Sequence, residues 1–241
     1  IVLKHLVFDC DGVLWQGTNE GYVRCYHRAA CEAGLEIDFE LAKTRILKHW
    51  GFAPRTEIAG MLVEHPDRVD EVLEHYERLI RTDLFLDSAR MVPGVDDTLR
   101  ELSRHYRLST LTGLHAENLE ILLDRFQLRD YFCRRISTIE TDDPAKQKPT
   151  GYPLRRLMEA EGLCAEEVLC IGDAASDVEM ARKQKVPVVV VLTGHLNEAQ
   201  ARALDVTAIL PSATALPDWI RARSTIHHSS KHTKRVLDRQ R

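Results

Sequence analysis

The sequence predicts an α/β fold: a Rossmann-like, doubly wound parallel sheet with a small α-helical domain inserted after the first strand. Short apolar runs alternate with segments of helical periodicity along most of the 241 residues, and this alternation is typical of a parallel sheet covered by helices. Residues 15–91 break the alternation, because they contain helical patterns only. We therefore expect an insertion there.

Five apolar runs are predicted to form buried strands, at residues 2–8, 106–111, 133–139, 168–171 and 187–192. Pro187 is compatible with the first position of its strand, where no ladder hydrogen bond is required of it. Apolar residues at helical spacing separate these runs, namely Val95, Leu99 and Leu102, then Leu119, Leu122, Leu123 and Phe126, then Leu154, Leu157 and Met158.

The insertion offers two amphipathic helical faces and no convincing strand between Leu14 and Tyr106. One face contains Tyr22, Tyr26, Ala29 and Ala33, and the other contains Val69, Val72, Leu73, Tyr76, Leu79 and Ile80. Pro93 and Gly94 mark the return to the sheet. We predict a core at 1–14 and 92–220, a helical cap at 15–91 lying over the end of the first strand, and a basic, flexible tail at 221–241.

Composition favours an intracellular protein that acts on small molecules. The chain has 33 Lys and Arg against 37 Asp and Glu, so it lacks the basic excess of a dedicated nucleic-acid binder. No apolar run is long enough to span a membrane. The six cysteines form no CxxC pair, which favours reduced thiols in the cytoplasm over disulfides or zinc. The composition of the tail favours a solvated segment over contact with an anionic partner.

Asp9 and Asp11 directly follow the first apolar run and are the most informative residues of the chain. Charge is costly beside a buried strand. The carboxyl ends of parallel strands form the ligand crevice of an open sheet, which makes this pair a candidate catalytic site. An Asx turn closing the strand is the alternative when the pair is taken alone.

A second acidic strand end lies at Asp173 and Asp177, directly after the run 168–171. Their spacing of four allows both carboxylates to face one crevice if a helix begins near Ala174. Four acids in one place require a cation. Oxygen ligands without a neighbouring His or Cys cluster favour Mg²⁺.

Two further strand ends carry groups suited to an anion. Thr112 and Gly113 follow the second strand and precede a helix, where a hydroxyl and free N–H groups can hold a phosphate oxygen. An ordinary helix cap is equally compatible with this pair. Lys148 stands beside Pro149, which stiffens its loop, and can supply a point charge. Lys146 is a competing candidate nearby.

Four groups of residues at strand ends resemble, in this order, the four motifs of the haloacid dehalogenase superfamily of phosphohydrolases. They are residues 9–13, Thr112, Lys148 with Pro149, and Asp173 with Asp177. The resemblance covers roughly residues 1–195. The position of the insertion is similar to that of the helical cap in the branch that contains phosphoglycolate phosphatase and β-phosphoglucomutase. Gly113 and Ala174 depart from the residues often found there, Asn and Ser.

The resemblance implies a role for each motif residue. Asp9 would be the nucleophile that forms an aspartyl phosphate, and Asp11 the general acid and base. Mg²⁺ would be held by Asp9, the Asp11 backbone carbonyl and Asp173, with Asp177 as a ligand or support. Thr112, Gly113 and Lys148 would bind the phosphoryl group.

The sequence therefore predicts a Mg²⁺-dependent phosphatase for a small phosphorylated metabolite. A phosphomutase that returns the phosphoryl group to a sugar, and a non-catalytic protein that binds a phosphorylated ligand, are the alternatives. Residues 50–56 form a candidate substrate-facing turn in the cap. Within it, Arg55 could pair with a substrate carboxylate or second phosphate, against the alternative of a solvated arginine.

Overall fold

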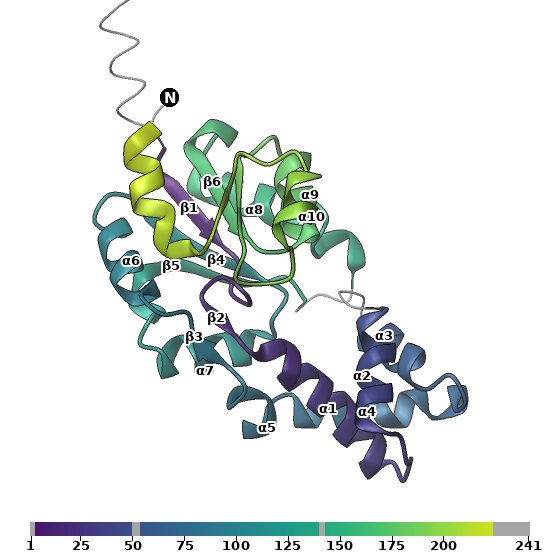
Figure 1. The fold of residues 1–241 in the computed structure, drawn as a ribbon. Helices are drawn as coiled ribbons and strands as arrows, with labels where there is room; N and C mark the ends of the chain where they lie inside the picture. Colours follow the sequence, from purple (N-terminus) through teal and green to yellow (C-terminus); the bar gives the residue numbers. More distant parts are fainter. Residues whose placement is uncertain (1–2, 50–53, 140–142, 224–241) are drawn as a thin grey trace, which may run out of the picture. The chain divides into compact units, whose positions relative to one another are not determined.

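The structure is a computed structural model that describes residues 3–49, 54–139 and 143–223 (Figure 1). Positions 50–53 of the predicted substrate-facing turn, and the tail from residue 224 onward, lie outside the described residues. The chain divides into two compact units. The first comprises 1–14, 92–116 and the chain from 127 onward, and the second comprises 15–91 and 117–126.

The first unit contains a six-stranded parallel sheet in the order β5-β4-β1-β6-β7-β8. The strands are β1 (His5–Phe8), β4 (Arg107–Thr112), β5 (Phe132–Ser137), β6 (Val168–Gly172), β7 (Val188–Val191) and β8 (Ala208–Leu210). β1 pairs with β4 on one side and with β6 on the other. The strand order reverses at β1, so the end of β1 is the topological switch point where open α/β sheets bind ligands.

Helices cover both faces of this sheet (Figure 1). α8 (Tyr152–Glu161), α9 (Ala175–Lys183) and α10 (Glu198–Arg202) lie on one side, and α6 (Val95–Leu102) lies on the other. The core on the α8 and α9 side joins Val7 of β1 to Leu157 of α8 and Val178 of α9. β1, β4, β6 and β7 are almost wholly buried, as predicted. The predicted burial of the strand at 133–139 is wrong, because β5 is an edge strand in which only Phe132 is buried.

The fold class and the five predicted strands are confirmed, with small shifts at their ends. Pro187 precedes β7, and its carbonyl accepts a hydrogen bond from Cys170. β8 was not predicted. It has only three residues, two of them partly exposed, so it carries no periodic apolar signal.

The second unit is helical. Its elements are α1 (Thr18–Glu32), α2 (Phe39–Leu47), α3 (Pro54–Met61), α4 (Val69–Leu79), α5 (Asp83–Leu86) and most of α7 (Ala116–Arg125). Asp38 caps α2 by accepting a hydrogen bond from the backbone N–H of Leu41. The predicted apolar faces of α1 and α4 meet here, since Tyr26 and Tyr76 stack with ring centroids 4.3 Å apart.

The expectation that no strand lies between Leu14 and Tyr106 is wrong. β2 (Trp15–Gln16) and β3 (Arg90–Met91) form an antiparallel ribbon where the chain enters and leaves this unit. Two residues span a single period of a strand, so alternation cannot reveal them. Among the described residues, no helix has both the length and the apolar character that a membrane crossing demands.

Candidate active site

The ends of β1 and β6 bring the two acidic motifs together. The backbone N–H of Asp9 donates to the carbonyl of Ile171 at 2.8 Å, which extends the β1–β6 pairing to the first aspartate. One carboxylate oxygen from each of Asp9, Asp173 and Asp177 lies within 4.8 Å of the others. Asp173 and Asp177 are buried, and the Asp9 side chain is 12% exposed.

Lys148 bonds to two of these carboxylates. Its Nζ lies 3.0 Å from Oδ1 of Asp9 and 2.7 Å from Oδ1 of Asp177. Lys146, the competing candidate, is instead 46% exposed and pairs with Asp143 at 3.2 Å. The structure therefore selects Lys148, and in the described part of the chain three carboxylates face this single ammonium.

Burial and the charges of neighbouring groups shift the pKa values of Asp173, Asp177 and Lys148. Burial raises the pKa of Asp173 well above its usual range, and the charges of Asp9 and Asp177 raise it further. Burial also raises the pKa of Asp177, although Lys148 opposes this shift. For Lys148, burial lowers the pKa, but the charges of Asp177 and Asp9 outweigh it and the net pKa is raised. The ammonium is thus held protonated against excess negative charge.

Three hydrogen-bond donors contact the carboxylate of Asp177. Its Oδ2 accepts hydrogen bonds from the backbone N–H groups of Asp173 at 3.3 Å and Ala174 at 3.2 Å, at the start of α9. Its Oδ1 accepts from Lys148. Gly172 makes this approach possible, because a Cβ there would lie 2.4 Å from Cβ of Asp177. Both oxygens are engaged, which favours Asp177 as a support over a direct ligand.

Thr112 and Gly113 lie at the end of β4, the strand beside β1. The buried Thr112 hydroxyl accepts a hydrogen bond from the backbone N–H of Leu114 at 3.3 Å. It also contacts the Cys10 thiol, whose pKa is raised by burial and lowered by this hydrogen bond. A Cβ at Gly113 would meet no atom within 4 Å, so its backbone is open to a ligand.

Asp11 lies beside Asp9 and is partly buried. Its charge also raises the pKa of Asp173, although burial and the charges of Asp9 and Asp177 have larger effects. Gly12, which follows it, has a φ of +72°, and a Cβ there would lie 2.4 Å from Oδ2 of Asp173. The turn after β1 thus packs on the second acidic motif, and only glycine fits there.

Sequence reasoning missed the loop after β7. The backbone N–H of His195 donates to Oδ2 of Asp173 at 2.8 Å, and the Thr193 hydroxyl donates to the Gly12 carbonyl at 2.5 Å. Burial lowers the pKa of His195, and the charge of Asp9 opposes this shift. The sequence signal that could have indicated this contact is the position of Thr193, Gly194 and His195 directly after a predicted strand.

Arg55 belongs to the second unit. It lies in the first turn of α3, its side chain is 60% exposed, and it forms an ion pair with Asp70. This exposed position agrees with the alternative interpretation of Arg55 as a solvated arginine, and its ion-pair partner belongs to the same unit. A role of Arg55 toward substrate stays a prediction.

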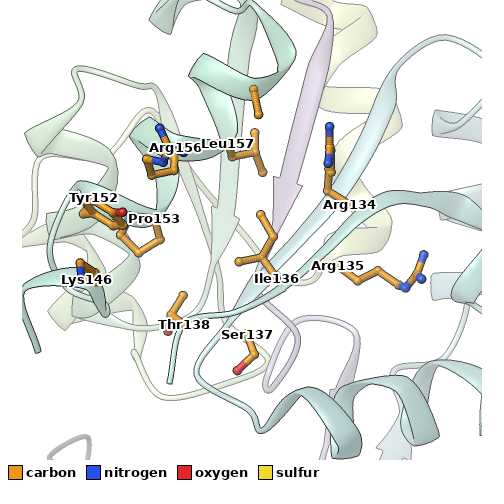
Figure 2. Close-up of a pocket in the computed structure, with 11 residues that line it drawn as sticks. Arg134, Arg135, Ile136, Ser137, Thr138, Lys146, Tyr152, Pro153, Arg156 and Leu157 are labelled. Atoms are coloured by element: carbon orange, nitrogen blue, oxygen red, sulfur yellow. The ribbon is translucent and has the colours of Figure 1, made fainter. Parts of the chain in front are cut away.

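A separate cavity of about 500 Å³ lies between β5 and α8 (Figure 2). Arg134, Lys146 and Arg156 line it, but each pairs with a carboxylate, respectively Glu161, Asp143 and Glu159. Figure 2 shows the Arg135 side chain extending away from the other lining residues. Three of the cationic side chains that line this cavity are therefore neutralised by carboxylates within the chain.

The sequence of this chain is similar to those of known proteins. Residues 6–191 match the model of the haloacid dehalogenase-like hydrolase family. The chain is 32% identical over 224 residues to a phosphoglycolate phosphatase from Rhodospirillum rubrum, with 90% of each chain covered. It is 30% identical to one from Synechococcus elongatus, covering 90% of this chain and 92% of the relative.

Solved structures show the same fold. A haloacid dehalogenase-like family hydrolase from Streptococcus pneumoniae superposes with a TM-score of 0.76 at 17% identity, covering 90% of this chain and 98% of that one. A structure described as a predicted phosphatase from Clostridium acetobutylicum superposes with a TM-score of 0.75 at 18% identity, covering 92% and 100%. At these identities the likeness concerns the fold alone.

Proposed function

This chain belongs to the haloacid dehalogenase-like hydrolases and is a phosphatase of that family, and from that premise we propose that it hydrolyses a small phosphomonoester with Mg²⁺ through an aspartyl phosphate on Asp9. One observation carries the proposal. Asp9 stands at the switch point of the sheet, bonded to the partly buried Lys148 and within 4.8 Å of two further carboxylates.

The donor chemistry of the cluster fits Mg²⁺. The grouped ligand atoms are carboxylate oxygens of Asp9, Asp173 and Asp177, and no His or Cys of the described residues joins them. We propose Asp9, the Asp11 carbonyl and Asp173 as the residues that hold the ion, with Asp177 in support. When bound, Mg²⁺ would offset the negative charge of the cluster and of the phosphoryl oxygens.

The first half-reaction transfers the phosphoryl group to the protein. A carboxylate oxygen of Asp9 attacks phosphorus, the bond from phosphorus to the substrate oxygen breaks, and Asp11 donates a proton to the leaving alkoxide. Lys148, the Thr112 hydroxyl and the Gly113 N–H hold the phosphoryl oxygens and stabilise the charge of the transition state.

The second half-reaction restores the carboxylate. Asp11, now ionised, takes a proton from a water molecule whose oxygen attacks phosphorus. The bond between phosphorus and the Asp9 oxygen breaks and inorganic phosphate leaves. Asp11 ends protonated and Asp9 ionised, so the cycle closes without another reactant.

The names of the relatives suggest the first substrate to test. The two bacterial relatives cited above are named phosphoglycolate phosphatases. 2-Phosphoglycolate carries a carboxylate beside its phosphate, and Arg55 is the residue of the second unit that we propose to recognise it. This assignment requires Arg55 to exchange its contact with Asp70 for the substrate.

The test is release of inorganic phosphate from a panel of carboxylate and sugar phosphates, with Mg²⁺ and with EDTA. We expect wild-type turnover that requires Mg²⁺, and a loss of about 10³-fold or more in Asp9→Asn, because removal of a covalent nucleophile has effects of that order. Asp218→Asn is the matched control, since Asp218 is exposed and pairs with Arg221.

Two outcomes would overturn the proposal. Isomer formation from a sugar phosphate without phosphate release would instead identify a phosphomutase. Unchanged turnover in Asp9→Asn would remove the nucleophile assignment. Rapid acid quenching of the wild type, followed by mass spectrometry of the peptide that contains Asp9, tests the covalent step directly.

A further inference from the structure

The loop Thr193–Gly194–His195 contacts both acidic motifs. It follows β7 and therefore lies at the same edge of the sheet as Asp9 and Asp173. The Thr193 hydroxyl donates to the carbonyl of Gly12, which directly follows Asp11, at 2.5 Å. This contact joins residues 181 positions apart in the chain. It ties the turn after β1 to the turn after β7.

The same loop holds Asp173 at two points. The N–H of His195 donates to its side-chain Oδ2 at 2.8 Å, and the N–H of Leu196 donates to its backbone carbonyl at 2.9 Å. The main chain and the carboxylate of Asp173 are thus bound by consecutive backbone donors, which restricts rotation of the carboxylate. Only Oδ2 is engaged by His195, so Oδ1 keeps its lone pairs for another partner.

Gly194 allows this contact. A Cβ at Gly194 would lie 1.8 Å from Oδ2 of Asp173, and a Cβ at Gly12 would lie 2.8 Å from Cα of Gly194. Both positions meet fixed groups, so neither can accept a side chain without displacing the carboxylate or the loop. The two glycines and the buried Asp173 form one packed unit.

We propose that Thr193, Gly194 and the N–H of His195 are positioning groups that hold Asp173 in the orientation that binds Mg²⁺. The inference rests on the proposed function, since it concerns the metal of that site. A carboxylate ligand whose orientation is set by its hydrogen-bond partners binds metal more tightly, and loss of such partners typically costs 10- to 100-fold in affinity.

The test measures Mg²⁺ binding directly, by isothermal titration calorimetry of the full chain. Thr193→Val removes the hydroxyl and keeps the shape, and Gly194→Ala places a methyl against Asp173. We expect each to weaken Mg²⁺ binding by about 10- to 100-fold. Asp173→Asn identifies the site, because it should abolish the same binding signal.

Thr207→Val is the matched control. Thr207 also bonds the backbone around β7, accepting from the N–H of Val188 at 3.1 Å, but it lies on the connection to β8. This variant should bind Mg²⁺ within about twofold of wild type, since the Thr207 hydroxyl bonds neither the turn after β1 nor the loop that holds Asp173. Circular dichroism of every variant shows whether it is folded, and Thr193→Val keeps the test available if Gly194→Ala does not fold.

The outcomes separate the inference from the proposed function. Wild-type Mg²⁺ affinity in folded Thr193→Val and Gly194→Ala overturns the inference, as does equal weakening in Thr207→Val. Selective weakening in the two loop variants supports it. If the wild type binds Mg²⁺ but hydrolyses no phosphoester, the proposed function fails while the positioning role stands.

Discussion

The two ends of β1 both bury titratable side chains, and they handle them in opposite ways. At the amino end, His5 is fully buried and its Nε2 lies 2.8 Å from Oγ of buried Ser109. Burial lowers the pKa of His5 to about 4, so the imidazole is neutral at pH 7. At the carboxyl end, Asp9 joins a cluster whose carboxylates outnumber the ammonium of Lys148.

The contrast distinguishes a structural polar group from a binding site. The His5–Ser109 pair is neutral and forms its hydrogen bond within the chain. When its carboxyl groups are ionised, the aspartate cluster carries negative charge that Lys148 does not balance, and burial makes that charge costly. A bound cation can relieve the free energy cost of burying these carboxylates. We therefore place binding and catalysis at the carboxyl end of β1 and not at its amino end.

Removing the ammonium at the acidic end should cause a large loss of turnover. Lys148→Met should lower kcat/KM by about 10²–10³-fold, because a buried charge that stabilises the transition state is lost. Steady-state phosphate release with Mg²⁺ measures the loss. Lys146→Met, which removes a half-exposed lysine two positions away, is the control and should retain activity near wild type. Equal losses in both variants would contradict the assignment of Lys148.

The amino end should be sensitive to acid. The folded pKa of His5 lies below its unfolded value of about 6.5, so the stability due to the neutral imidazole is full above pH 6.5 and is lost as the pH falls towards 4. The loss approaches about 3 kcal/mol. Urea unfolding between pH 7 and pH 4 should show a smaller decline in His5→Gln than in wild type.

Exposed His105 supplies the control for that experiment. His105→Gln should reproduce the wild-type dependence of unfolding free energy on pH. If His5→Gln and wild type decline in parallel, the buried imidazole is not the group responsible.

Relieving charge at the acidic end should stabilise the metal-free protein. The raised pKa of Asp173 means that, without metal, stability falls as the pH rises above the unfolded value of about 4. Asp173→Asn removes this cost and should raise the free energy of unfolding in EDTA at pH 7 by about 1–3 kcal/mol, while abolishing activity. Chemical denaturation measures the change. A destabilised Asp173→Asn would show that repulsion is already balanced within the chain.

The smallest effect is expected in the second unit. Arg55 and Asp70 form an exposed ion pair that solvent screens, so Arg55→Ala should leave the free energy of unfolding close to that of the wild type. If Arg55 recognises a substrate carboxylate, KM for 2-phosphoglycolate should rise by about tenfold with kcat retained. A phosphomonoester without a carboxylate is the control substrate, and an equal rise for both would exclude this role.

The sequence predicted those parts of the fold that carry a periodic apolar signal. The five longer strands of the sheet and the helices α1, α4, α6, α7 and α8 were predicted in this way. β8 and the β2–β3 ribbon were missed because two or three residues are too few to show a period. α7 follows β4 in the chain and reads as a core helix, yet residues 117–126 group with the second unit. Asn118, for example, donates to the Ile80 carbonyl at 2.9 Å, a contact without a local signature.

By itself, the sequence determined the fold class and the acidic motifs, because apolar periodicity and charge at strand ends are local properties. Tertiary structure decided which groups meet. It selected Lys148 over Lys146, gave both oxygens of Asp177 structural partners, and brought the Thr193–His195 loop onto Gly12 and Asp173. These contacts depend on strand order and on the rotation of individual side chains. Both are settled only when strands distant in sequence pair side by side.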